Sequence, residues 1–224
     1  MMKEAEPNAG YSIFDDVLSP RECSVIANAL AGSKAKRAGA RNLMSNPMVA
    51  DLAFDPRLLA LAADFLGTAA SPFRATLFEK SARTNWHVLW HQDRALPLSR
   101  HCDSREWGPW TTKAGVLYAL APAWALAQVV AIRIHLDAST SENGPLRVIP
   151  HSHQAGVLSA SDIRQVMSRR TPDTCLVGRG GALAMRPLLL HSSMKARTDE
   201  PRRVIHFEYA GELNFGLGLR LCAA

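Results

Sequence analysis

From about residue 73 onward, the chain becomes a succession of short strand-type runs separated by glycine, proline and asparagine. The runs are residues 74–79, 87–90, 115–119, 129–136, 146–149, 174–177, 182–185, 188–192 and 204–209. So many short strands within one domain predict a sandwich or barrel, because each strand must bury one face against another sheet. This half also holds most of the histidines.

The residues before position 70 show helical patterns instead. Ser19 and Glu22 form a predicted capping box, and Gly32 lies just past the apolar stripe that follows it. Further helices are expected to begin at Asn46-Pro47, at Asp55-Pro56 with Gly67 as the stop, and at Ser159 with Asp162 at its third position. We therefore expect one domain over 1–224 (α+β, mainly β), with helical support at 1–70 and a β core at 73–212.

The uncharged stretch 114–132 is long enough to raise the question of a membrane span. Pro122 and Gln128 interrupt it, so two buried strands joined by a loop are the favoured interpretation. The N-terminus has acidic residues and no apolar segment typical of a secretory signal. The four cysteines are widely spaced, which favours reduced thiols and a cytoplasmic location.

The net charge of +6 has two readings. The first is a domain that is simply basic, and the second is a small-molecule substrate or partner that is anionic. The positive charge forms no single block and no nucleic-acid motif is found, so we expect no nucleic-acid partner. The sequence does not indicate an oligomeric state.

His91 and Asp93 stand two residues apart at the end of a predicted strand. Alternate residues of a strand point to the same side, so both side chains can face one point. An imidazole and a carboxylate are two ligands of the 2-His-1-carboxylate triad of non-haem Fe(II) oxygenases, and His191 is the best candidate for the third. A single histidine is more often a hydrogen-bonded core or surface residue, so the motif needs support from elsewhere.

That support comes from the residues after His191. Ser193 shares a strand face with His191, and Arg202 begins the next strand. An arginine deep in a barrel needs an anion, and its guanidinium suits a carboxylate such as the distal one of 2-oxoglutarate. These residues predict a site that binds Fe(II), 2-oxoglutarate and O2.

His91-Gln92-Asp93, Asn143-Gly144-Pro145-Leu146, the run from Ile149 to His153, and His191-x-Ser193 followed by Arg202 resemble the phytanoyl-CoA dioxygenase family over nearly the whole chain. The resemblance implies a double-stranded β-helix (jelly-roll, cupin-like) core and oxidative decarboxylation of 2-oxoglutarate. It also implies iron ligands at His91, Asp93 and His191 and co-substrate contacts at Ser193 and Arg202. Related halogenases lack the carboxylate, so Asp93 favours hydroxylation.

Two positions depart from the family pattern. His151 stands where relatives usually have glycine, so either the loop is altered or His151 reaches the site. Arg133 stands where relatives often have tryptophan, and it either touches 2-oxoglutarate or an anionic substrate, or it faces outward and pairs with a carboxylate. Both roles stay open at this point.

Other candidates carry weaker signals. Trp107 and Trp110 lie on a long polar loop and are expected either in the core or in a lid, and Tyr118 joins them as a tentative substrate residue. Lys80 is read as a surface lysine, with guidance of an acidic group as the alternative, and His87 has the strand parity to line the site.

The predicted function is hydroxylation of a C–H bond in a small molecule, with release of succinate and CO2. Desaturation and ring formation are other outcomes of the same chemistry. One rival class is a cupin-like metalloenzyme that needs no 2-oxoglutarate, and another is a non-catalytic jelly-roll binding protein.

Overall fold

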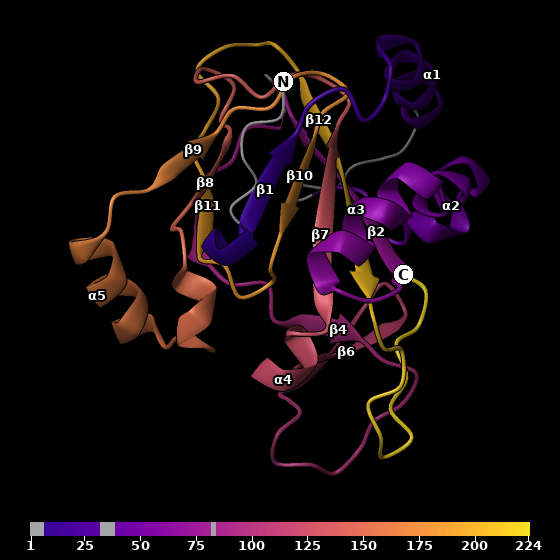
Figure 1. Ribbon diagram of the computed structural model, residues 1–224, viewed down its shortest axis with the longest axis vertical. Coiled ribbons are helices and arrows are strands. Elements are labelled where there is room, and N and C mark those ends of the chain that lie inside the picture. The colour runs from indigo at the N-terminus through magenta and orange to yellow at the C-terminus, as the bar shows by residue number, and fades with distance from the viewer. Residues whose placement is uncertain (1–6, 32–38, 82–83) are drawn as a thin grey trace.

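The computed structural model describes residues 7–31, 39–81 and 84–224, and a five-stranded antiparallel sheet forms its centre (Figure 1). In spatial order its strands are β1 (Tyr11–Phe14), β10 (Ala182–Met185), β7 (Val129–His135), β12 (Arg202–Ala210) and β2 (Ser71–Lys80). Every residue of β7 is buried, because this middle strand is covered on both faces of the sheet.

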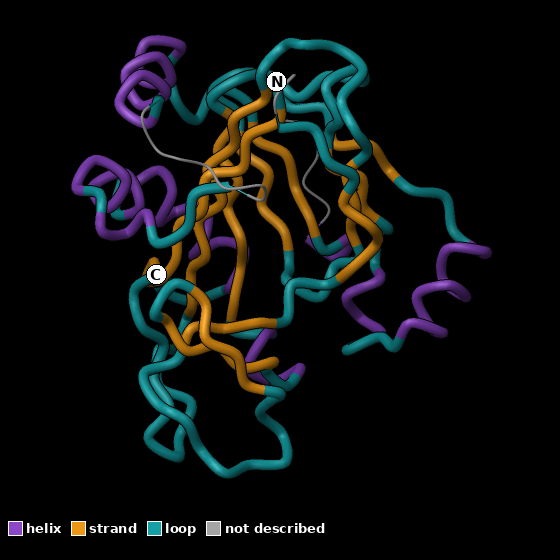
Figure 2. Tube along the Cα trace, turned by 180° about the vertical axis from the view of Figure 1, so that it is seen from behind, coloured by secondary structure: helices purple, strands orange, loops and turns teal. Residues whose placement is uncertain are grey.

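A second antiparallel sheet faces the first, as the view from behind shows (Figure 2). Its order is β3 (Val88–His91), β11 (His191–Ser193), β8 (Leu146–Val148) and β9 (Asp173–Cys175). A third sheet closes one end with β4 (Ala95–Pro97), β6 (Val116–Leu120) and β5 (Trp110–Lys113). The two facing sheets confirm the jelly-roll core expected from the sequence.

Helices cover the outer face of the large sheet: α1 (Pro20–Leu30), α2 (Pro47–Ala53) and α3 (Pro56–Leu66) (Figure 1). Their apolar stripes pack with β7 and β12 into the main core, which includes Leu58, Ile132 and Phe207. The capping box at α1 is confirmed, since Glu22 N donates to Ser19 Oγ and Ser19 N donates to the Glu22 carboxylate. Gly67 ends α3 in the left-handed region at φ 73°, whereas Gly32 lies outside the described residues.

A further helix, α5 (Ala160–Arg169), begins at the predicted Ser159 capping box. Three strands were not expected: β1, β4 and β5 are short, and their pairing depends on neighbours distant in sequence. β1 therefore adds a strand to the large sheet from the part expected to be helical only. A short helix, α4 (Ala123–Leu126), replaces the loop expected between β6 and β7.

The predicted strand 188–192 is also shorter than expected. Residues 186–189 form a turn, in which Leu189 N donates to Arg186 O, and β11 begins only at His191. Among the described helices, none is long and apolar enough to cross a membrane.

Candidate metal centre

His91 and His191 are direct cross-strand partners in the antiparallel pair of β3 and β11. Their ring centroids lie 4.2 Å apart. Each Nδ1 donates to the carbonyl two residues earlier, Leu89 O and Leu189 O, at 2.8 Å. These bonds fix both rings with Nε2 free as a ligand atom, which is how proteins orient metal-binding histidines.

Asp93 completes the group from just beyond the end of β3. Its backbone N–H donates to Pro187 O at 2.9 Å, which holds the residue against the turn before β11. Asp93 Oδ1 lies 3.7 Å from His91 Nε2, and Oδ2 lies 3.5 Å from His191 Nε2. The ligand atoms of these three residues all lie within 4.8 Å of one another. Two imidazole nitrogens and one carboxylate oxygen fit a facial triad for Fe(II).

The protonation states also suit a metal. Burial alone would raise the pKa of the Asp93 carboxyl, but the facing histidines, led by His191, hold it below its usual range. Burial lowers the pKa of His191 to about 4, against the opposing effect of Asp93. An ionised carboxylate beside a neutral imidazole is the form in which both groups bind metals.

Gln92, between the two ligands, anchors this segment in a way the sequence did not reveal. Its Nε2 donates to Gly156 O at 2.8 Å and to Leu188 O at 2.7 Å. Its Oε1 accepts from Leu158 N at 2.8 Å. Three bonds from one buried amide tie the metal strand to two other segments and restrict how His91 and Asp93 can move.

A cavity of about 200 Å³ opens beside the three ligands. Apart from the ligands, its lining consists of Phe78, Lys80, Trp86, Val88, Arg133, Leu146, Ser193 and Arg202. Lys80, Arg133 and Arg202 are all buried cations, and among the described residues that line the cavity Asp93 is the one that is acidic. Such an excess of buried positive charge is costly unless an anion enters the cavity.

Lys80 is 1% exposed, so the reading as a surface lysine was wrong. Its Nζ donates to Ser193 Oγ at 2.7 Å and also to Met194 O. Burial, followed by the charges of Arg202 and Arg133, lowers the pKa of Lys80 to about 7. Its position at the end of β2, directly opposite Arg202 on β12, was not visible without knowledge of strand pairing.

Arg202 and Ser193 meet the turn formed by Asn143 and Gly144. Arg202 Nε donates to Asn143 O at 3.3 Å, and Ser193 Oγ donates to Gly144 O at 2.9 Å. Gly144 has φ 70°, and a Cβ there would lie 2.5 Å from Met194 O, so the close approach requires glycine. Burial, and then the charge of Arg133, lowers the pKa of Arg202 to about 9.

Arg133 faces inward, which decides between its two readings. Its NH1 lies 2.9 Å from His206 Nδ1, and its guanidinium lies 5.3 Å from the centroid of the Phe78 ring. Its Nε is buried and has no hydrogen-bond partner among the described residues. Asp137, which shares its predicted strand face, pairs instead with Arg203 at 2.7 Å.

His151 does not line the cavity. It adopts a left-handed conformation that glycine takes up more easily, at φ 63°, and its Nδ1 donates to Asn8 O at 2.9 Å. The histidine is therefore held by the backbone of the N-terminal segment and does not reach the candidate metal ligands. His87 is exposed and also lies outside the cavity lining.

The three aromatic residues considered as substrate contacts, Trp107, Trp110 and Tyr118, lie in different parts of the structure. Trp107 is buried against Trp124 and Phe215 in a second core cluster, so the structure places it in the core and not in a lid. Trp110 stacks on His101, at 4.5 Å between ring centroids. Only Tyr118 reaches a pocket next to a metal ligand, a second hollow that Asp93 also lines.

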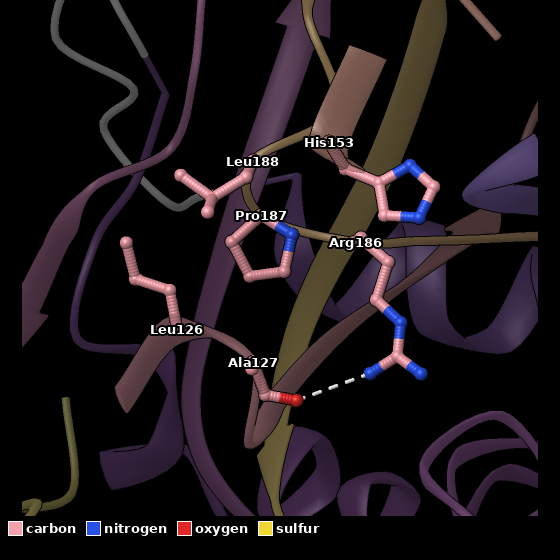
Figure 3. A pocket seen from close by; sticks show the side chains of 6 residues that line it. All are labelled: Leu126, Ala127, His153, Arg186, Pro187 and Leu188. Carbon is pink, nitrogen blue, oxygen red and sulfur yellow. Dashed lines mark hydrogen bonds between the residues drawn. The ribbon is translucent and has the colours of Figure 1, made fainter. Parts of the chain in front are cut away.

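Another hollow, of about 250 Å³, is lined by Leu126, Ala127, His153, Arg186, Pro187 and Leu188 (Figure 3). Arg186 crosses it and donates to Ala127 O at 3.2 Å and to Phe65 O at 2.8 Å. Its guanidinium is thus already engaged with backbone carbonyls, and none of the three candidate ligands lines this space.

The sequence over residues 8–204 matches the model of the family described as phytanoyl-CoA dioxygenase (PhyH). No protein of curated function matches the chain.

Solved structures share the fold at low sequence identity. EctD from S. alaskensis is 21% identical, with a TM-score of 0.69 over 94% of this chain and 78% of that one. SnoN, described as a non-heme alpha ketoglutarate dependent epimerase from nogalamycin biosynthesis, is 18% identical, with a TM-score of 0.66 over 92% of this chain and 79% of that one. HygX from Streptomyces hygroscopicus, solved with nickel and 2-oxoglutarate, is 20% identical, with a TM-score of 0.65 over 91% and 83%.

Proposed function

The chain belongs to the phytanoyl-CoA dioxygenase family, and from that premise we propose that it is an Fe(II)- and 2-oxoglutarate-dependent oxygenase that hydroxylates a C–H bond of a small molecule. EctD and HygX support the choice of cofactors, because structures of each have been solved with iron and with 2-oxoglutarate. The main support for the proposal comes from this chain itself. The candidate ligand atoms of His91, Asp93 and His191 lie within 4.8 Å of one another, and these residues line the same cavity as three buried cations.

The charges of this cavity support binding of a dianion. Lys80, Arg133 and Arg202 bring three positive charges to a wall where Asp93 is the one carboxylate. A metal ion would neutralise Asp93, which increases the demand for negative charge further. 2-Oxoglutarate carries two carboxylates, one for the metal and one for the cations, and so matches this need.

Each residue then has a defined task. His91, Asp93 and His191 hold the iron, and Arg202, Ser193 and Lys80 bind the distal carboxylate of 2-oxoglutarate. Arg133, whose guanidinium lies 5.3 Å from the centroid of the Phe78 ring, adds a further cation to the cavity, and the apolar side chains Val88 and Leu146 help to exclude water from it. Bound iron supplies activation of O2 coupled to oxidative decarboxylation of 2-oxoglutarate to succinate and CO2.

Hydroxylation is the specific outcome that Asp93 favours. A carboxylate in the third ligand position leaves no coordination place for a halide beside 2-oxoglutarate and O2. SnoN is described as an epimerase. No residue of the site in this chain favours epimerisation over hydroxylation.

The proposed function is tested by succinate formation. The protein is supplied with Fe(II), 2-oxoglutarate and O2, with and without a panel of small molecules, and succinate is measured. We expect succinate that depends on all three components, with more of it and a product 16 mass units heavier when a substrate is present. A cupin-like enzyme independent of 2-oxoglutarate, or a binding protein, would form no succinate above the background of free iron.

A further inference from the structure

The second hollow beside Asp93 has about 320 Å³, near the lower end of the range for small-molecule sites. It is lined by Arg41, Arg74, Thr76, Phe78, Gln92, Asp93, Arg94, Ala95, Lys113, Tyr118 and Leu120. Phe78 and Asp93 also line the co-substrate cavity, so the two spaces meet at the metal centre. A substrate bound in this second hollow would lie next to Asp93, one of the three candidate metal ligands.

Four segments that are separate in sequence bring cations to this hollow, namely Arg41, Arg74, Arg94 and Lys113. Arg41 follows Ala40, which exchanges two backbone hydrogen bonds with Leu77 of β2. Arg94 directly follows the ligand Asp93, and Lys113 ends β5. Since separate segments converge, the positive charge results from the fold and not from a run of basic residues in the sequence.

Little of this charge is neutralised by the protein. Arg74 pairs with Glu208 at 2.6 Å and donates to Ala95 O at 2.9 Å. For Arg41, Arg94 and Lys113, no carboxylate of the described residues lies within ion-pair distance. Among the described lining residues, four cations face a single carboxylate, Asp93, and such an excess of positive charge concentrates anionic ligands.

Arg94 gives an independent sign of a missing ligand. Its Nε is buried and has no hydrogen-bond partner among the described residues. A buried charged donor without an acceptor is costly, and an anion in the hollow would supply the acceptor. Tyr118, whose ring lies 5.8 Å from both the Arg74 guanidinium and the Lys113 ammonium, closes the same wall.

We propose that this hollow is the substrate site and that it takes a small molecule carrying a phosphate or carboxylate group, which Arg94, Arg41 and Lys113 bind. The inference rests on the proposed function, because it assigns the substrate of that same metal site. Asp93 lies at the metal end of the hollow, so the anionic group is drawn to the cationic wall and a neutral part of the substrate faces the metal. Arg74 pairs with Glu208 and donates to Ala95 O, so its role is to hold the lining of the hollow in place and not to bind the anionic group.

The test titrates inorganic phosphate and acetate, separately, into the full chain loaded with Fe(II) and saturating 2-oxoglutarate without O2. Calorimetry measures the affinity of each probe. Saturation with 2-oxoglutarate fills the first cavity, so the probes report on the second. The variants are Arg94→Gln and Lys113→Gln, and Arg164→Gln on exposed α5 is the matched control with the same loss of charge.

We expect at least one probe to bind, and Arg94→Gln to weaken it by about tenfold or more. Lys113→Gln should weaken it by a few-fold, and Arg164→Gln by less than about twofold. The tighter of the two probes identifies the anionic group. Failure of both probes to bind, or wild-type affinity in Arg94→Gln, would overturn the inference.

The visible absorption of the Fe(II) complex with 2-oxoglutarate is recorded in the same samples. If this absorption is present but neither phosphate nor acetate binds, the proposed function stands and the substrate class is wrong. If the absorption is absent but binding that depends on Arg94 persists, the anion site stands and the proposed function fails. Circular dichroism and thermal unfolding establish that each variant is folded.

Discussion

Lys80 Nζ lies 2.7 Å from Ser193 Oγ, at the buried end of the cavity beside the metal ligands. The pair joins the end of β2 to β11, and so connects the two facing sheets of the jelly roll. Arg202, the register partner of Lys80, brings a second cation to the same place. Binding of a carboxylate here must therefore depend on whether Lys80 carries its proton.

The affinity for 2-oxoglutarate is expected to fall as the pH rises above about 7. Burial and the nearby arginines lower the pKa of Lys80 to about 7, so the ligand-free protein loses this charge above that pH. A bound carboxylate favours protonated Lys80, hence binding takes up a proton there. The affinity should drop by up to about tenfold per pH unit. Titrations of 2-oxoglutarate into the Fe(II) protein from pH 6 to 9 measure this slope.

The variant Lys80→Met should bind 2-oxoglutarate more weakly and flatten this slope. Lys195→Met, which removes an exposed lysine, serves as the control and should keep it. An unchanged slope in Lys80→Met would assign the coupled proton to another group.

Arg202→Ala should raise the 2-oxoglutarate concentration needed for half-maximal turnover by roughly ten- to a hundredfold, because a hydrogen bond to a charged group is lost. The maximal rate should fall less, since the metal ligands are intact. The neighbouring Arg203→Ala is the control, because Arg203 pairs with Asp137 outside the cavity lining. Equal changes in both variants would contradict a specific role for Arg202.

His191→Ala should lose metal affinity by at least about tenfold and abolish 2-oxoglutarate decarboxylation, since a direct ligand matters more than its supporting partners. Equilibrium dialysis with Fe(II) and a succinate assay provide the two readouts. His101→Ala is a matched control, since His101 also lies near an aspartate, Asp103, at 3.8 Å, but on the exposed surface. Full decarboxylation by His191→Ala would refute the assignment.

Substitution of His151 should change the stability of the fold, through its backbone conformation, and leave metal binding unchanged. His151→Gly relieves the left-handed conformation but loses the bond to Asn8 O, so the free energy of unfolding should change by less than about 1 kcal/mol. His151→Val places a β-branched residue at φ 63° and should cost about 1–2 kcal/mol. Denaturant unfolding measures both, and unchanged iron binding in both variants is part of the expectation.

The three candidate metal ligands that the structure brings together could be picked out from the sequence, because His91 and Asp93 are close along the chain and His191 follows a strong apolar run. The fold class was predictable as well, since the alternation of short strands is a local signal. The reasoning about Asp93 was only partly right: β3 ends at His91, and the Asp93 backbone bond to Pro187 O sets its place.

Gln92 and Arg94 were not recognised, and Lys80 was favoured as a surface lysine, because their positions depend on strand register and on loops that meet only in the folded chain. For Trp107 the sequence left both a core and a lid position open. An aromatic residue on a polar loop resembles a lid in sequence, but contacts with Trp124 and Phe215 put it in the core. Burial of a loop residue is a tertiary property that composition does not carry.

The most direct measurement of the central claim is the visible spectrum of the protein with Fe(II) and 2-oxoglutarate under anaerobic conditions. Wild type should show a weak metal-to-ligand charge-transfer band that appears only when both are present. The band should vanish in His191→Ala and require more 2-oxoglutarate in Arg202→Ala. Absence of the band from wild type that demonstrably holds iron, or a full band in His191→Ala, would contradict the claim.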